Sequence, residues 1–182
     1  MFEVLALIAS FIGMSFVVCA YFVKKKELYL LFQFLCIIFL ILSYFFTGEY
    51  FAMAGLVVAL IRTLVFYLYE KKGMLAPLIW PIVFTILSLA SYFIINLWIL
   101  GTIKPVDTIF LIGLIFYAFI FRIRDLKIVR FSMPIPTGLS LLYNVLSHAP
   151  IFAVLSYAFE LSANIVSIFK YHVIKPKQKT LG

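Results

Sequence analysis

The chain has 182 residues, of which 66% are hydrophobic and 12% are charged, and its formal net charge is +8. A soluble domain is typically about 45–50% apolar and about 25% charged, so this composition excludes an ordinary soluble protein and indicates an integral membrane protein. The positive charge does not indicate nucleic-acid binding, because the basic residues lie between apolar runs rather than on one face.

Hydropathy predicts seven membrane-spanning helices, each close to the roughly 20 residues that cross the hydrocarbon core. Strands are excluded because open sheet edges cannot face lipid and the runs lack the alternation of a barrel. The first run carries Glu3 instead of a basic n-region and exceeds the apolar core of a signal peptide, so we expect it to be retained. The predicted spans are residues 2–23, 28–47, 50–70, 76–99, 105–121, 128–147 and 150–170.

The basic residues are distributed unevenly between the two predicted faces of the membrane. Lys104 is on one face, Arg62 is within a span, and the other 13 of the 15 basic residues follow spans one, three, five and seven. The positive-inside rule therefore predicts that the N-terminus is outside and the C-terminus is in the cytoplasm. Such clusters can also bind anionic lipid or a partner. They are Lys24, Lys25, Lys26, Lys71, Lys72, Arg122, Arg124, Lys127, Arg130, Lys170, Lys175, Lys177 and Lys179.

Two charged residues fall near the middle of predicted spans: Arg62 in the third and Glu160 in the seventh. A charge at this depth costs about 2.5–3.5 kcal/mol on insertion scales and persists when it is partnered inside a bundle or water cavity. We therefore expect Arg62 and Glu160 to meet. The seventh span also has polar residues at spacings of four, four and three, which places them on one inward helical face; they are Ser156, Glu160, Asn164 and Ser167.

The fourth and sixth spans carry local signals of their own. Trp80 and Trp98 would lie about 27 Å apart in a helix, which is typical of two interfacial anchors. We expect this fourth span to be a connector, with Asn96 near the outer interface. Pro134 and Pro136 lie in the first turns of the sixth span and should bend or loosen that end.

The sequence contains no recognisable catalytic or metal-binding motif. Cys19 and Cys36 lie inside apolar runs without a Cys-x-x-Cys pair, and we interpret both as small buried hydrophobic residues. We place His148 at the membrane interface. The protein is therefore not expected to be an enzyme or to hold a cofactor or metal.

The spans follow a three, one, three pattern that indicates an internal repeat. We predict an all-α membrane protein with seven transmembrane helices, in which two parallel three-helix bundles are joined by a connector helix (3+1+3). The predicted parts are a first bundle (1–73), the connector (74–103), a second bundle (104–172) and a basic cytoplasmic tail (173–182). The repeat aligns Gly13 with Gly113 and Tyr44 with Asn144 at a shift of 100 residues, and Arg62 with Asn164 at 102.

Three short segments carry a resemblance to a known family: Ile61-Arg62-Thr63-Leu64, Asn144, and Asn164-Ile165-Val166. On these segments the chain resembles the YgjV-type bacterial inner-membrane proteins over nearly its whole length. That family is similar in plan to the SWEET sugar facilitators and the PnuC vitamin-precursor transporters, which implies a SWEET-like fold. In SWEET proteins, asparagines on the third and seventh helices contact the sugar. Asn164 matches the second of these, whereas Arg62 stands near the first and differs from it.

These observations predict a transporter-like protein of the inner membrane that moves a small polar solute, anionic or zwitterionic, through a midplane site between the bundles. Arg62 would bind or neutralise the solute, Glu160 would be its counter-ion or a proton carrier, and the two asparagines would orient it. The predicted substrate-binding residues are Arg62, Glu160, Asn164, Asn144, Ser156 and Tyr44.

A second interpretation is a membrane receptor or assembly protein of the same fold, in which a buried Arg62–Glu160 ion pair only joins the bundles. The expected partners are a small solute and the lipid bilayer, and nucleic acid is not expected. The sequence leaves homo-oligomerisation open.

Overall fold

The computed structural model describes residues 2–99, 101–102, 104–147, 149 and 151–173, and its regular elements are all helices. By length and composition, four described helical segments could cross a membrane: α1, α2, α3 and Ile79–Trp98; α5 is a shorter apolar helix. The elements are α1 (Phe2–Phe22), α2 (Lys26–Thr47), α3 (Tyr50–Lys71), α4 (Ile79–Phe93), the π-helical η1 (Ile94–Ile99), α5 (Pro105–Ile120), α6 (Leu126–Ser132), α7 (Pro134–Leu146), α8 (Ile151–Ile168) and the π-helical η2 (Phe169–Val173).

Each of the seven predicted segments contains helix, so the all-α prediction is confirmed. The sixth segment is interrupted as its prolines predicted: α6 ends at Ser132 and α7 begins at Pro134. Pro134 and Pro136 lack the N–H that would continue the helical ladder, and proline is well accommodated in a first turn. His148 and the tail residues Lys175, Lys177 and Lys179 lie outside the described residues.

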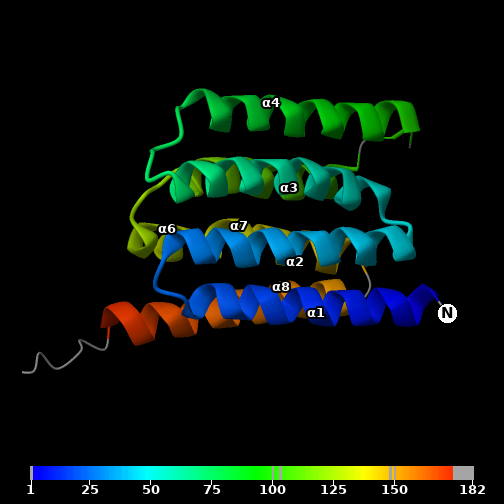
Figure 1. Ribbon diagram of the computed structural model, residues 1–182. Coiled ribbons are helices and arrows are strands. Elements are labelled where there is room, and N and C mark those ends of the chain that lie inside the picture. The colour runs from blue at the N-terminus through cyan, green and yellow to red at the C-terminus, as the bar shows by residue number, and fades with distance from the viewer. Residues whose placement is uncertain (1, 100, 103, 148, 150, 174–182) are drawn as a thin grey trace, which may run out of the picture.

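The helices pack in two layers (Figure 1). α1, α2 and α3 lie side by side in one layer, and α8, α7 and α5 lie behind them. α1 packs against α8 at one edge and α3 packs against α5 towards the other, where α4 contacts both α3 and α5. The two halves of the chain therefore face one another across the centre of the molecule.

The outer surface is apolar and the interior is unusually polar. Phe11 is 62% exposed and Ile86 is 59% exposed, whereas Gln33 and Thr137 are buried. This distribution suits a molecule whose surroundings are lipid, where apolar side chains face the acyl chains and polar ones turn inward. Cys36 is buried as predicted, but the prediction for Cys19 is wrong because it is exposed. It lies about 200° around α1 from the buried Val17, on the outward face.

Two glycines that are 100 residues apart make matching contacts between helices. A Cβ added at Gly13 would lie 3.3 Å from the carbonyl oxygen of Cys36, and one added at Gly113 would lie 3.4 Å from that of Pro136. These two carbonyl groups are also 100 residues apart. The close approach of α1 to α2 therefore matches that of α5 to α7 at the predicted shift of 100 residues.

The loops that follow α1, α3 and α5 lie at the same end of the molecule as η2 (Figure 1). We call this the basic end, because the basic residues of these segments gather there in space as well as in sequence. The described members are Lys24, Lys25, Lys26, Lys71, Lys72, Arg122, Arg124, Lys127, Arg130 and Lys170.

Filling the close approach at Gly13 is expected to destabilise the protein. Gly13→Val should cost about 1–3 kcal/mol of unfolding free energy, because the added methyl groups overpack the α1–α2 contact. Thermal unfolding in detergent would measure the loss. Gly138→Ala is the matched control, since a Cβ there meets nothing within 4 Å and the change should be neutral or stabilising. Equal melting temperatures for Gly13→Val and wild type would contradict the packing described.

Candidate functional site

The carboxyl group of Glu160 is the point where four helices meet. Glu160 lies in the middle of α8 and is 6% exposed. Its Oε1 accepts hydrogen bonds from the hydroxyl of Tyr21 on α1 at 2.9 Å and from Nε2 of Gln33 on α2 at 3.4 Å. Thr137 on α7 lies beside this carboxyl group. Glu160, on the inward polar face predicted for the seventh span, therefore meets polar groups from both layers.

Further hydroxyl groups lie next to these donors. Gln33 Nε2 also reaches the hydroxyl of Tyr29 at 3.5 Å, and the rings of Tyr21 and Tyr29 meet edge to face with centroids 5.6 Å apart. Thr137 shares a hydrogen bond of 3.0 Å with the hydroxyl of Tyr117 on α5. Every group in this network other than Glu160 itself is neutral, so the carboxylate is held by dipoles and not by a cation.

Arg62 is 2% exposed on α3 and has a separate set of partners on α5. Its Nη1 donates to the carbonyl oxygen of Leu114 at 2.8 Å. The guanidinium carbon lies 5.5 Å from the ring centre of Tyr117 and 5.3 Å from that of Phe121, which are cation–π distances. Among the described residues Nε has no hydrogen-bond partner. Arg62 is thus held in place with part of its donor capacity unused.

A cavity of about 30 Å³ lies between the two charged residues, and Arg62 and Glu160 both line it. Gln33, Tyr117 and Tyr157 complete its polar wall, and the rest is formed by Cys36, Phe121 and aliphatic side chains. A cavity needs about 10–15 Å³ open to a water-sized sphere to hold one water molecule, so this space suits water rather than a larger solute. The two residues therefore face a common hollow in the interior.

The prediction that Arg62 and Glu160 pair directly is wrong. The only ion pair within the described part of the chain joins Lys26 and Glu70, at 2.9 Å. Arg62 is drawn to the α5 carbonyl and to two aromatic rings, while the donors of α1 and α2 hold Glu160 on the opposite wall. The positions of the two residues along their predicted spans placed them at the same depth in the membrane. Those positions carried no information about the neutral partners that compete for each charge.

The other predicted site residues do not line this cavity. The hydroxyl of Tyr44 donates to Oδ1 of Asn144 at 2.8 Å, and Nδ2 of Asn144 donates to the carbonyl oxygen of Ser140 at 2.7 Å. This pair joins α2 to α7, and both groups of the Asn144 amide are satisfied. Ser156 lines a different hollow of about 110 Å³ between α1 and α8. We call the hydrogen-bonded pair the Tyr44–Asn144 lock. The lock and the second hollow are both distinct from the central cavity.

Asn164 has a surprising environment. Its side chain is fully buried, and neither Oδ1 nor Nδ2 has a partner among the described residues. Buried amides are nearly always hydrogen-bonded, so an unsatisfied one calls for a specific explanation such as a ligand or a water molecule.

Sequence reasoning missed Tyr21, Gln33, Thr137 and Tyr117. Gln33 could have been found, because a glutamine inside the apolar run of the second span is a polar signal of the same kind as Asn164. The two tyrosines and the threonine could not, since such residues are common in membrane helices and their roles depend on which helix faces them.

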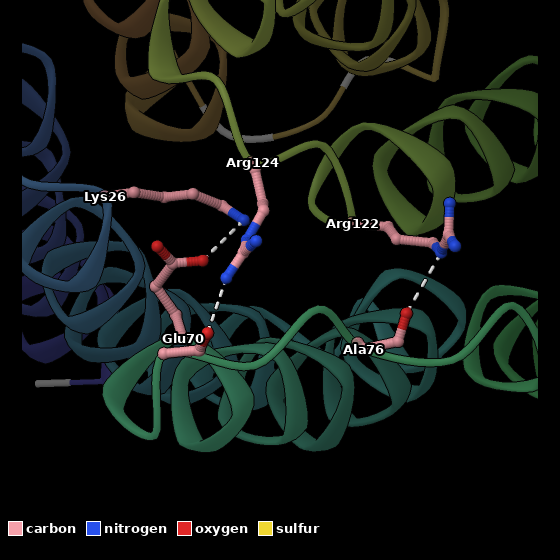
Figure 2. A network of polar contacts seen from close by, with 6 residues as sticks. Lys26, Glu70, Ala76, Arg122 and Arg124 are labelled. Atoms are coloured by element: carbon pink, nitrogen blue, oxygen red, sulfur yellow. Dashed lines mark hydrogen bonds and ion pairs between the residues drawn. The ribbon is translucent and has the colours of Figure 1, made fainter.

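The basic end is closed by contacts that we call the basic-end clasp, made by Lys26, Glu70, Arg122 and Arg124 (Figure 2). Besides the Lys26–Glu70 ion pair, Nε of Arg122 donates to the carbonyl oxygen of Ala76 at 3.0 Å. Arg124 donates to the carbonyl oxygen of Gly73. Two arginines that follow α5 thus bind backbone carbonyl groups of the loop that follows α3.

The C-terminal end of α1 is capped in a related way. Arg130 donates to the carbonyl oxygens of Tyr21 and Val23, and the hydroxyl of Tyr171 donates to that of Phe22 at 2.8 Å. Residues of the second half therefore hold two carbonyl-rich segments of the first half at the basic end.

A family model described as "Imp-YgjV: Bacterial inner membrane protein" matches residues 4–175. No curated protein and no solved structure matches the chain.

The Tyr44–Asn144 lock is expected to contribute to stability. Tyr44→Phe removes the hydroxyl and leaves Oδ1 of Asn144 buried without a donor, which should cost about 1–3 kcal/mol. Thermal unfolding in detergent would measure this cost, and Tyr50→Phe is the control because Tyr50 is exposed. If the two substitutions lower the melting temperature equally, the lock has no stabilising role.

Proposed function

Because the chain belongs to the Imp-YgjV family of bacterial inner membrane proteins, we propose that it is a transporter that moves a small polar solute, anionic or zwitterionic, through the cavity between Arg62 and Glu160. The observation that carries this proposal is the cavity itself, which a guanidinium group and a carboxyl group from opposite halves of the chain line together. Ionisable side chains inside the membrane are costly and typically mark solute or ion paths.

The partners of Arg62 point to the charge of the solute. Within the described residues no carboxylate lies within ion-pair distance of the guanidinium group, and its Nε–H is unused. A planar guanidinium with free donors binds carboxylates and phosphates through paired hydrogen bonds. A solute with such a group would supply the anion that Arg62 lacks, and Glu160 and Gln33 would contact its remaining polar groups.

We propose the 3+1+3 plan for the architecture, with bundles at 1–73 and 104–172 joined by a connector at 74–103, and with the C-terminus in the cytoplasm. Matching contacts of Gly13 and Gly113 support a repeat of 100 residues. Tyr44 and Asn144 occupy equivalent positions in that repeat and touch one another, which is expected of residues on the axis between two related bundles. Parallel-repeat transporters hold their solutes at this interface.

We propose that the basic-end clasp closes the cavity towards one end. Towards the other end we assign this role to the rings of Phe51, Phe110 and Tyr143, which pack with centroids 4.8–6.2 Å apart. A space that suits water must enlarge to admit a solute, so we take the structure as an occluded form. Opening would release the clasp at one end or separate the aromatic rings at the other.

A receptor or assembly protein of the same fold is the second candidate. Two observations favour it: the small volume of the cavity, and the protein donors that already occupy the Glu160 carboxyl group. In that case the central polar groups would orient the helices without binding a solute.

Arg62 should be required for uptake but not for folding. We expect Arg62→Gln to lower uptake about 10–100-fold, because a charged hydrogen bond contributes about 1.5–3 kcal/mol. The measurement is uptake by proteoliposomes of labelled gluconate, lactate, phosphate, glycine and taurine, with Lys72→Gln at the exposed basic end as control. Uptake of none of these solutes by wild-type protein, or equal uptake by Arg62→Gln, would favour the receptor or assembly role.

The clasp should control access to the cavity, and Cys36 on the cavity wall provides a natural reporter. In a Cys19→Ser background, we expect Glu70→Gln to increase the rate at which a small water-soluble methanethiosulfonate labels Cys36, because Lys26 loses its charged partner. Glu27→Gln is the matched control, since it removes the same charge at the same end outside the clasp. Equal labelling rates for both variants would mean that the clasp is not a gate.

A further inference from the structure

Glu160 is a buried carboxyl group in a membrane interior whose direct partners are all neutral. Its surroundings contain one feature that favours the protonated form and another that favours the ionised form. Burial without a cation disfavours the ionised form, whereas donors from Tyr21 and Gln33 favour it. A group balanced in this way can take up and release a proton when its surroundings change.

Arg62 is the one other charged residue that lines the cavity with Glu160. The buried guanidinium of Arg130 lies at the basic end, where it donates to the carbonyl oxygens of Tyr21 and Val23. α1 presents Tyr21, α2 presents Tyr29, Gln33 and Cys36, α5 presents Tyr117, α7 presents Thr137, and α8 itself adds Tyr157. α3 presents Arg62 across the cavity. The net charge of the core therefore depends on three things: the guanidinium, the proton on Glu160 and the charge of the solute.

From this charge balance we propose that the protein carries one monoanion together with one proton, which binds to Glu160. This inference rests on the proposed transport function. In the empty form Arg62 is positive and Glu160 negative, so the core is neutral. In the loaded form the anion neutralises Arg62 and the proton neutralises Glu160, so the core is neutral again.

Each half-loaded form carries an unbalanced charge. An anion bound without a proton leaves the core at −1, and a proton bound without an anion leaves it at +1. Net charge in the membrane interior costs several kcal/mol, so these two forms would rearrange far less often than the neutral ones. Binding of the anion then favours binding of the proton, and the reverse holds by thermodynamic linkage.

A chain of hydroxyl groups leads from Glu160 towards the basic end. Tyr21 donates to Glu160, and the ring of Tyr29 meets that of Tyr21 edge to face with centroids 5.6 Å apart. Tyr29 lies one turn after Lys26 on α2, next to the clasp. When the clasp opens, a proton can pass along this chain. Each hydroxyl group accepts one proton and releases another, so the number of protons on the hydroxyl groups does not change.

The proton site can be tested without any solute. Infrared difference spectra of purified protein, recorded as the pH is lowered, should contain the carbonyl band of a protonated buried carboxyl group. We expect this band in wild type and in Glu70→Gln, and its loss in Glu160→Gln, where the amide keeps an acceptor for Tyr21 and Gln33. The same band in Glu160→Gln would overturn the proposal.

Coupling is tested in proteoliposomes with labelled gluconate, an impermeant monoanion. An inward gradient of one pH unit should drive about tenfold accumulation at one proton per anion. A membrane potential set with potassium and valinomycin should leave uptake unchanged, because both translocating forms are neutral. Uptake that responds to the potential but not to the pH gradient would overturn the coupling. If the infrared band behaves as expected and no panel solute is taken up, the proton site is supported and the transport function fails.

Discussion

The fold depends on hydrogen bonds to one buried carboxyl group. In lipid there is no hydrophobic force to bring helices together, so close packing and polar contacts between helices decide their arrangement. Tyr21 and Gln33 donate to Glu160 from two different helices, and Thr137 on a third helix lies beside it. Rotation of any of these helices would bury a polar group without a partner, which makes the network a strong constraint on helix orientation as well as a chemical site.

Much of the fold could be predicted from the sequence, because its causes are local. The helices follow from hydropathy, and the break before Pro134 follows from the missing N–H group. Gly13 and Gly113 make contacts that fit the predicted repeat, because each permits a close approach that a side chain would obstruct. Cys19 was misplaced because composition indicates that a residue is in the membrane but not whether it faces lipid or protein.

The site was harder to predict, because its contacts join segments that are far apart in the sequence. Arg62 and Glu160 were predicted to lie at the same depth in the membrane, and both line one cavity. The predicted partner of each was the other residue, which is wrong because Arg62 binds the carbonyl of Leu114 instead. Tyr44 and Asn144 were predicted to bind the solute, yet they form a hydrogen-bonded pair that does not line the cavity. A carbonyl such as that of Leu114 is invisible to sequence reasoning, because every residue has one and only the packing of α3 on α5 exposes it to Arg62.

The separation of the two charges bears on whether they serve structure or function. A buried ion pair recovers its desolvation cost only when the two groups touch with good geometry. Had Arg62 and Glu160 evolved only to join the halves, direct contact would be the economical arrangement. Instead each is held by its own neutral partners on one wall of a shared cavity. That arrangement keeps both charges turned towards a shared space, which supports the proposed binding site over a structural bridge.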